Sequence, residues 1–415
     1  MWNERLISLL GLLVFTLIAW ALSTNRKGVS PRIVIWGLGL QVVTALLVIG
    51  IPALGIRAPL GVVFTALNNT VLSILAYGDE GTKFLFGNLL DEQRMGGVIF
   101  AFRVLPSIIF FSCLMSVLYY FGVLQKVVYG LAWIMKRSLK TSGPETLSAA
   151  GNIFLGQTEA PLLIKPYLKG LSNSELLCIM IGGMANVAGG VLAAYVLLLQ
   201  SRMPDIAGHL ITVSVMSAPA SLLVAKLLMP ETQNIDDELK MDLEIQDANV
   251  VDAATRGASE GLLLALNVGA MLIAFVGVVA LLNGALHYVT ELMGYPLTLQ
   301  MILGFLFKPV AWLLGVPAQD LSTIAQLLGE KIVLNEFVAY LNLSQISANL
   351  SDRGVLLASY ALCGFANVAS IGIQVGGIGA MAPERRHDLA KLGWRALLGG
   401  NLATFMCAAI VGVLT

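Results

Sequence analysis

The sequence predicts an all-α polytopic membrane protein with about eight transmembrane helices, two re-entrant helical hairpins and inverted-topology repeats. Composition is the first reason: 57% of the 415 residues are hydrophobic and 12% are charged, with a mean hydropathy of +0.83, whereas soluble domains carry about 25% charged residues. Secondly, apolar runs of roughly twenty residues, the length of a membrane-crossing helix, recur along the chain. Thirdly, the tetrapeptide Ala-Asn-Val-Ala occurs at 185–188 and again at 366–369, inside apolar sequence.

Eight stretches are long and apolar enough to be predicted as spans. They are expected to be helices, because the bilayer core offers no water to unpaired backbone groups and the alternating pattern of barrel strands is absent. Residues 58–78 and 297–315 contain Pro or Lys and are expected to be short or interfacial. The predicted spans are 4–22, 31–50, 97–121, 174–199, 205–229, 262–286, 350–381 and 388–414.

Basic residues predict the orientation of these spans. Clusters at 26–32, 126–140 and 385–395 all fall on the inner side if the N-terminus is outside, as the positive-inside rule expects. The acidic segment 230–261 is then an inner loop, and Thr415 ends outside.

Two further stretches, 143–171 and 318–348, do not fit as spans. Each is about thirty residues long with polar groups at its centre, and counting either as a crossing would move basic clusters to the wrong side. We expect re-entrant hairpins, in which one arm enters, turns at mid-depth and leaves on the same side. Irregular backbone at that depth requires surrounding protein or a water-filled cavity.

Shared features divide the chain into repeats. "GLAWIM" (130–135) precedes the first hairpin centre by about the distance at which "PVAWLL" (309–314) precedes the second. Each unit then has three crossings, and an odd number inverts the second copy, as in alternating-access transporters. The predicted divisions are N-terminal scaffold spans and interfacial helices (1–96), a first repeat (97–229), the acidic loop (230–261) and a second repeat (262–415).

At the centre of the first hairpin, Gly156 permits a sharp turn and Pro161 suits the first turn of a new helix. Gln157, Thr158 and Glu159 therefore lie at a helix N-terminus with unpaired N–H groups. They either cap the hairpin or contact an uncharged solute with amide-like edges. Three adjacent polar side chains exceed what a cap requires.

The second hairpin places Glu336 after Asn335 at its centre, where a carboxylate is costly unless paired or hydrated. An ion pair with Lys331 could lock the hairpin. Alternatively, or in addition, Glu336 accepts hydrogen bonds from vicinal hydroxyls of a ligand.

Asn186 and Asn367, the repeated asparagines, are flanked by Gly and Ala, so breaks in the fourth and seventh spans are expected. Each amide could satisfy freed backbone groups or face a ligand. Asn367 shares a helix face with Ser370. Asn186 is expected to pair with Asn152 of the first hairpin, and these oxygens with freed carbonyls suit a monovalent cation.

Several classes are excluded. The sequence has no Walker sequence, aspartyl-phosphate motif or zinc signature, so an ion gradient is the expected energy source. No Ser/His pair, Asp dyad or metal-ligand set lies at depth, so an enzyme is not expected. The zero net charge indicates no nucleic-acid partner.

These motifs resemble the concentrative nucleoside transporter family over nearly the whole chain. The resemblance is carried by "GNIFLGQTEAPLLIKPYL" (151–168), "GGMANVAGGVLAAY" (182–195), "GEKIVLNEFVAY" (329–340) and "CGFANVASIGIQVGG" (363–377). It implies the eight-span bacterial form, a homotrimer, and a mobile transport part that moves like an elevator. Together with the orientation predicted from the basic residues, this gives a bacterial inner-membrane protein with periplasmic termini.

The resemblance also implies site residues. Nucleobase contacts are Gln157, Thr158 and Glu159, with apolar or aromatic neighbours Val191, Leu264 and Phe365; ribose contacts are Glu336, Asn367 and Ser370. The implied sodium ligands are Asn152, the Leu155 carbonyl, Asn186 and the Val187 carbonyl. Position 186 is often Ser or Thr in sodium-coupled members, whereas here it is Asn, which offers a neutral oxygen on a longer side chain.

The sequence therefore predicts a sodium-coupled nucleoside importer with no organic cofactor. One alternative is a proton-coupled nucleoside symporter, with Glu159 or Glu336 titrating. A hairpin-type carrier for an organic anion is disfavoured, because its site should contain Arg or Lys at a hairpin tip and neither tip has one.

Overall fold

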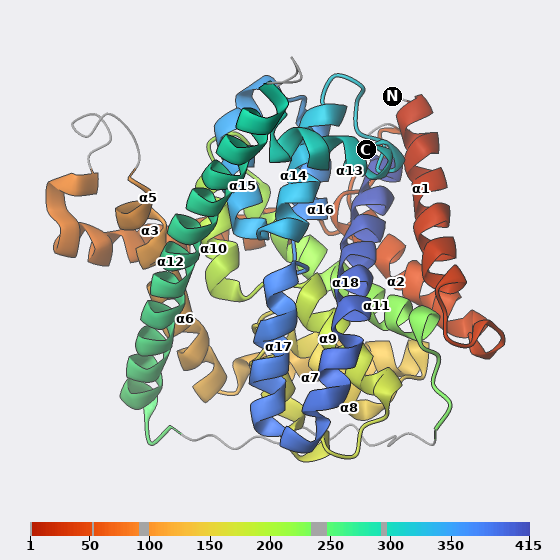
Figure 1. Cartoon of the computed structure of the whole chain (residues 1–415). Coiled ribbons are helices and arrows are strands. Elements are labelled where there is room, and N and C mark those ends of the chain that lie inside the picture. Colours follow the sequence, from red (N-terminus) through yellow and green to blue (C-terminus); the bar gives the residue numbers. More distant parts are fainter. Residues whose placement is uncertain (1, 52–53, 91–98, 234–246, 292–296) are drawn as a thin grey trace.

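The computed structural model describes residues 2–51, 54–90, 99–233, 247–291 and 297–415, and within these ranges the chain is helical and forms no β-strand. Figure 1 shows long helices running between an upper end, which carries both termini, and a lower end. This arrangement confirms the predicted all-α class.

The N-terminal part contains three long helices. α1 packs against α18 and α2 packs against α11, which attaches this part to both repeats. Their bounds, with two short 3₁₀ turns, are α1 (Trp2–Ala21), η1 (Arg26–Gly28), α2 (Pro31–Val48), α3 (Gly61–Phe86) and η3 (Gly87–Leu90).

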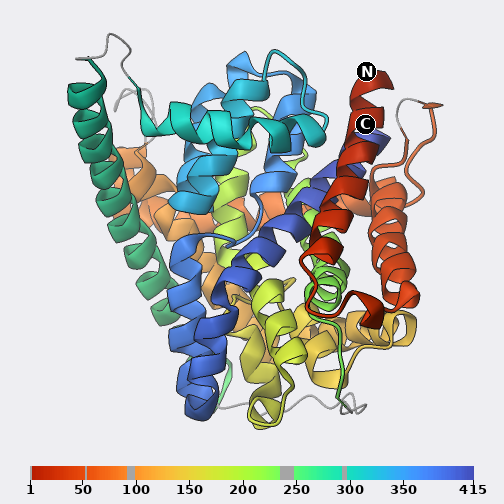
Figure 2. The ribbon, with the colours of Figure 1, turned by 45° about the vertical axis from the view of Figure 1, so that its right-hand side comes forward.

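Residues 58–78 were predicted to be short or interfacial, and the first alternative is wrong, because α3 is 26 residues long and, with η3, apolar enough to cross a membrane. The length was missed because Asp79, Glu80 and Lys83 interrupt the apolar pattern. Lys83 pairs with Glu80 within the helix at 2.9 Å, and Asp79 pairs with Arg103 of the following repeat at 3.4 Å, so each of these charges has a partner. Both ribbon views show α3 lying across the direction of α1, α12 and α18 (Figures 1 and 2).

The first repeat follows, and its fourth predicted span is broken at the first Ala-Asn-Val-Ala, as expected. Residues 97 and 98 of the predicted third span lie outside the described residues. The bounds are α5 (Phe100–Arg103), α6 (Leu105–Tyr120), α7 (Val123–Leu139), α8 (Gly143–Gly151), η4 (Ala160–Tyr167), α9 (Asn173–Ala185), α10 (Gly189–Leu199) and α11 (Ile206–Leu228).

The second repeat begins with one long helix and contains the second break, between α16 and α17. Residues 297–315 form a short helix, as predicted. The bounds are α12 (Val250–Glu291), α13 (Leu299–Leu313), α14 (Leu321–Val333), α15 (Glu336–Ile346), η5 (Ser347–Asn349), α16 (Asp352–Leu362), α17 (Val368–Met381), η6 (Pro383–Arg385) and α18 (Arg386–Leu414).

α12 is longer at both ends than the predicted span 262–286, and residues 250–261 are helix rather than loop. The Asn249 side chain caps its start by accepting from the N–H groups of Val251 and Asp252, at 2.9 and 3.0 Å. One turn further, Arg256 pairs with Glu260 at 3.0 Å. The remainder of the predicted acidic loop includes residues 234–246, which lie outside the described residues.

The first hairpin enters and leaves at the same end of the molecule. Lys226 of α11 lies 2.8 Å from the Glu145 carboxylate near the start of α8 and donates to Ser174 near the start of α9, at 2.9 Å. One lysine therefore contacts residues next to the start and just after the end of 143–171, which excludes a straight crossing.

The second hairpin closes in the same way at the opposite end. Asp320, which precedes α14, accepts from the Ser351 N–H at 3.2 Å, and Ser351 precedes α16. In Figure 1, α8 lies at the lower end and α14 and α15 lie in the upper half. The predicted pair of re-entrant hairpins in inverted repeats is confirmed.

The two helix breaks cross each other. The N–H of Phe365 donates to the Asn186 carbonyl at 3.2 Å. Gly364 has φ +127, and a Cβ there would lie 2.8 and 2.9 Å from the Met184 and Ala185 carbonyl oxygens. Only glycine fits this backbone conformation and this approach.

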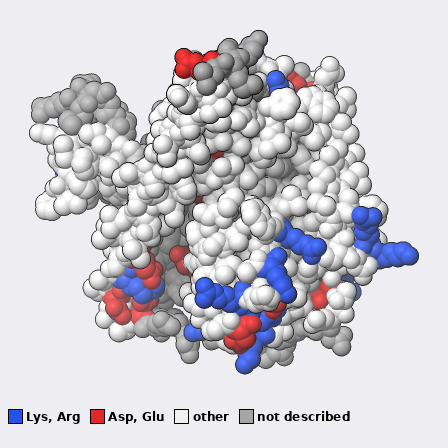
Figure 3. Space-filling view, in the orientation of Figure 1, with Lys and Arg blue, Asp and Glu red and all other residues white. Residues whose placement is uncertain are grey.

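Charged side chains are unevenly distributed over the visible surface (Figure 3), and the predicted orientation stays a prediction. Most Lys and Arg on the face shown in Figure 3 lie in its lower half, and a broad band above them carries few charges. The lower end is therefore the predicted inner side.

Replacing Gly364 with Ala should lower the free energy of unfolding by about 2–4 kcal/mol, because it combines a strained φ with overpacking against two carbonyls. Thermal unfolding in detergent measures this. The matched control is Gly372→Ala on the exposed side of α17, where a Cβ meets nothing within 4 Å and should be neutral or stabilise by up to about 1 kcal/mol. Equal effects would contradict the crossing.

Candidate ligand-binding site

A cavity of about 330 Å³ lies where the two hairpin tips meet the two helix breaks and α12. The structure brings all nine predicted substrate residues to its lining: Gln157, Thr158, Glu159, Val191, Leu264, Glu336, Phe365, Asn367 and Ser370. They come from five separate segments, so only the folded chain assembles them. Their role in binding stays a prediction.

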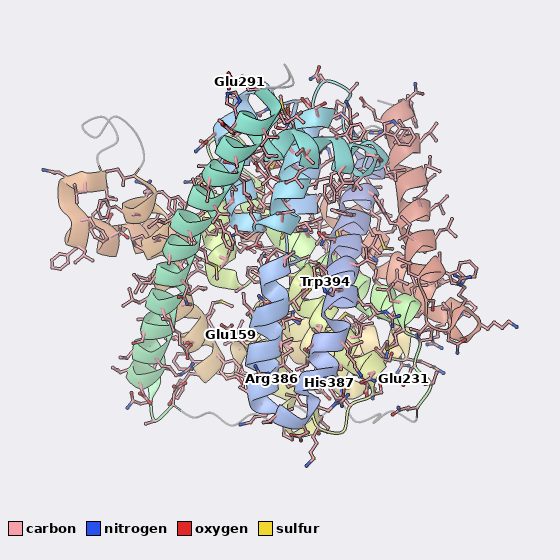
Figure 4. The ribbon with its side chains drawn as sticks, viewed as in Figure 1. Glu159, Glu231, Glu291, Arg386, His387 and Trp394 are labelled. Carbon is pink, nitrogen blue, oxygen red and sulfur yellow. The ribbon has the colours of Figure 1, made fainter. Side chains whose placement is uncertain are left out.

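The tip of the first hairpin is organised by Glu159. Its carboxylate accepts from the Gly156 N–H at 2.8 Å, and Gly156 has no positive φ; a Cβ there would lie 3.4 Å from that carboxylate. The glycine therefore provides space for the carboxylate rather than an unusual turn. Glu159 is exposed toward the cavity region between α12 and α17 (Figure 4).

Gln157 connects the two repeats. Its Nε2 lies 3.4 Å from Ser370 Oγ, to which it donates, and its Oε1 is buried with no hydrogen-bond partner. A buried amide oxygen without a donor is costly. Gln157 lines the cavity, and its Oε1 lacks the N–H or O–H donor that would offset this cost.

Glu336 at the second tip is buried, and two donors contact it. Tyr195 Oη donates at 3.2 Å and Asn367 Nδ2 at 2.8 Å. The alternative ion pair with Lys331 is wrong, since the ammonium donates instead to the Ala361 carbonyl and to Thr404.

Asn367 has two functions in the fold. Its Oδ1 caps α17 by accepting from the Ser370 N–H at 2.9 Å, while its Nδ2 donates to Glu336. The predicted sharing of one turn by Asn367 and Ser370 is confirmed by this bond.

The predicted cation ligands gather beneath the first tip. Asn186 Nδ2 donates to the Gly182 carbonyl at 3.3 Å, and a Cβ on Gly182 would lie 3.1 Å from Asn152 Nδ2, so both asparagines lie at that glycine. Asn152 Oδ1 is buried without a hydrogen-bond partner, whereas Asn186 Oδ1 accepts from Ser217 Oγ at 2.5 Å. Val187, which follows Asn186, is fully buried, and the neighbouring Gly189 N–H donates to the Phe154 carbonyl, next to Leu155, at 3.1 Å. A neutral-oxygen donor set of this kind fits a hard monovalent cation.

Sequence reasoning missed two polar side chains, one on α10 and one on α12. Asn267 lines the cavity one turn after Leu264 on α12, whereas Tyr195, one turn after Val191 on α10, is not part of the lining and contacts the site by donating to Glu336. Helical spacing from the two predicted apolar contacts would have found both. The other unpredicted lining residues are Gly156, Ala188, Val268, Met271, Leu272, Asn335, Phe337, Ala369 and Ile373.

A second cavity of about 300 Å³ shares Glu159 with the first and is bounded by Lys165, Asp247, Arg256 and Glu260. Arg256 Nε donates to the Asp247 carboxylate at 2.8 Å and holds the pKa of that carboxyl below its ordinary value. This cavity lies between the candidate site and the start of α12, at the predicted inner side.

Inverted repeats with hairpin tips around one polar, mid-depth cavity define a secondary transporter. Known sequence families agree. Residues 10–89 match the Na+ dependent nucleoside transporter N-terminus, 101–202 match the nucleoside recognition family, and 209–412 match the Na+ dependent nucleoside transporter C-terminus. The chain belongs to the concentrative nucleoside transporter family and is a transporter rather than an enzyme.

Individual relatives extend the match to the full chain. An uncharacterized transporter of Haemophilus influenzae is 46% identical over 98% of this chain and 97% of its own length. Sodium/nucleoside cotransporter 1 of mouse is 42% identical over 99% of this chain, which spans 64% of that protein. CNTnw in an inward-facing substrate-bound state superposes with a TM-score of 0.91 at 42% identity, covering 99% of both chains. A variant of it in an outward-facing state gives 0.92 at 42% identity, covering 100% and 98%.

Asn367→Ala should lower the free energy of unfolding by about 2–4 kcal/mol, because it removes a helix cap and a donor to a buried carboxylate. Thr298→Ala is the matched control, since it removes only the cap of α13 and should cost about 1 kcal/mol. Both are measured by thermal unfolding without ligand. A smaller effect at Asn367 would show that Glu336 does not depend on this donor.

Proposed function

We propose that this protein is a sodium-coupled nucleoside importer that works by elevator-type alternating access. The observation that carries the proposal is the single cavity into which two inverted hairpins and two crossed helix breaks place amide, hydroxyl and carboxylate groups beside apolar surface. A nucleoside has the same division, with a flat base carrying amide-like edges and a ribose carrying vicinal hydroxyls.

The base would bind at the first hairpin. Gln157, Thr158 and Glu159 provide acceptors and donors, and the partnerless Oε1 of Gln157 needs a donor such as a base N–H. The apolar lining would contact the faces of the ring: Val191, Leu264 and Phe365.

The ribose would bind at the second hairpin. Glu336 is a charged acceptor, with Asn367 and Ser370 beside it, and a carboxylate accepts well from two neighbouring hydroxyls. In the structure the carboxylate is already partnered by Tyr195 and Asn367, which offsets part of its burial cost before a ligand arrives.

Sodium would bind through Asn152, Asn186 and the carbonyls of Leu155 and Val187. The partnerless Asn152 Oδ1 supports this assignment. Bound sodium would hold the tip of the first hairpin and so complete the base site. Polar groups without partners would cost on the order of several kcal/mol when they cross the apolar barrier, so the loaded protein moves most readily.

The proposed moving and fixed parts follow the divisions of the sequence. Residues 1–96 provide scaffold spans and interfacial helices, whereas hairpins 143–171 and 318–348 of the repeats 97–229 and 262–415 move with the substrate. The second cavity, beyond Glu159, would be the inner release path.

We further propose a homotrimer in a bacterial inner membrane, with both termini periplasmic. Both termini lie at the end opposite most of the visible basic residues (Figures 1 and 3). α3 and α12 have large exposed apolar faces, which lipid or neighbouring protomers would cover.

Two alternative transport functions make different predictions from those of a sodium-coupled nucleoside importer. A proton-coupled symporter would use Glu159 or Glu336 as the titrating group. A carrier for organic anions has less support, since the cavity lining contains no Lys or Arg among the described residues.

Uptake of radiolabelled uridine into proteoliposomes should exceed equilibrium under an inward sodium gradient. A sodium ionophore should abolish this accumulation, and collapse of the proton gradient should not. Uptake in sodium-free buffer that rises with acidity would favour the proton-coupled alternative, and uptake indifferent to both gradients would refute ion coupling.

Two matched variants control this assay. Glu336→Gln should reduce uptake by about 10-fold or more, because hydrogen bonds to a charged group contribute about 1.5–3 kcal/mol. Glu330→Gln in the same hairpin should retain uptake, since that carboxylate accepts from Asn342 and lines no part of the cavity.

A further inference from the structure

Lys331 is a fully buried lysine near the end of α14. Its Nζ donates to the Ala361 carbonyl at 2.8 Å and to Thr404 Oγ1 at 3.0 Å, and it lies 5.6 Å from the centre of the Phe405 ring. Among the described residues no carboxylate forms an ion pair with it. A buried ammonium is expensive, so its position requires an explanation beyond packing.

The repeats place Lys331 opposite Asn152. When Trp133 is aligned with Trp312, Asn152 coincides with Lys331. The same register aligns Gln157 with Glu336, and both of these line the cavity. Lys331 is therefore the counterpart, in the second repeat, of a proposed sodium ligand.

The surroundings of the two residues correspond as well. Asn152 lies by Asn186 at the end of α9, where a hydroxyl of α11, from Ser217, contacts the amide. Lys331 contacts Ala361 in the last turn of α16 and a hydroxyl of α18, from Thr404. In each repeat the residue, Asn152 or Lys331, lies beside the carboxyl end of a half-helix, where unpaired carbonyls and the helix dipole favour a cation.

The two places differ in their hydrogen bonding. In the first repeat, Asn152 Oδ1 and Ser148 Oγ are buried and have no hydrogen-bond partner. In the second repeat, the Ala361 carbonyl and the Thr404 hydroxyl both accept from the ammonium. In the first repeat, the buried oxygens need a cation. In the second repeat, the side chain of Lys331 supplies the cation.

We propose that the Lys331 ammonium is the covalently attached counterpart of the exchangeable sodium ion, filling in the second repeat the cation site that sodium fills in the first. This inference rests on the proposed function. Each hairpin tip is then supported by one cation, and only the first repeat takes its cation from solution. Coupling to sodium therefore arises in one repeat alone.

Moving the ammonium tests the proposal. Lys331→Asn restores the neutral amide of the first repeat, so sodium should enter: the Hill coefficient for sodium in uridine binding should rise from about 1 to about 2. Sodium should also raise the melting temperature of this variant more steeply than that of the native chain. Lys331→Met has similar length but no ligand atoms, and should gain no such response.

The reciprocal variant is Asn152→Lys, which should bind uridine without sodium, while the uncharged Asn152→Met should bind weakly at every sodium concentration. The proposal is overturned if folded Asn152→Lys still requires sodium, or if Lys331→Asn keeps the native sodium dependence. It is equally overturned if Lys331→Asn stays unfolded at high sodium. Sodium-independent binding by the native chain would instead refute the proposed sodium coupling.

Discussion

The crossing of two interrupted helices is the constraint on which this structure depends. Where α9 and α16 stop at mid-depth, backbone groups lose their helical partners, and none can be left facing hydrocarbon. The Phe365 N–H meets the Asn186 carbonyl there, and Gly364 allows the close approach. Because backbone groups of the two breaks form a hydrogen bond with each other, the polar side chains nearby need not bond to the backbone and can line the cavity.

That crossing explains why the repeated asparagines differ. Asn186 ends a half-helix and points its amide toward Gly182 and Ser217, away from the cavity lining. Asn367 begins a half-helix and points its amide to Glu336. The asparagine of the tetrapeptide is thus the C-cap of α9 in the first repeat and the N-cap of α17 in the second. In the first repeat it lies at the proposed cation site, and in the second it lines the ligand cavity.

The hairpins, the breaks and the polar cavity residues could be predicted from the sequence, because polar side chains within apolar runs are too costly to be accidental. The apolar cavity residues Val191, Leu264 and Phe365 carry no such signal and were expected only from the family resemblance. The full lengths of α3 and α12 could not be predicted, because charged residues such as Asp79 and Arg256 interrupt the apolar pattern. In the folded chain these residues form ion pairs and the helices continue through them. The hydrogen-bond partners of Lys331 could not be predicted either. Sequence spacing suggested Glu336, whereas in the fold the ammonium donates to the Ala361 carbonyl and the Thr404 hydroxyl, which come from distant helices.

In the proposed mechanism one hairpin holds the base and the other holds the ribose. Binding of uridine and of 2′,3′-dideoxyuridine to purified protein, for the native chain, Gln157→Ala and Glu336→Gln, tests it most directly. Glu336→Gln should weaken uridine binding by about 10-fold or more and leave dideoxyuridine nearly unchanged. Gln157→Ala should weaken both ligands alike. Equal losses of both ligands in both variants would contradict the division of the ligand between the two tips.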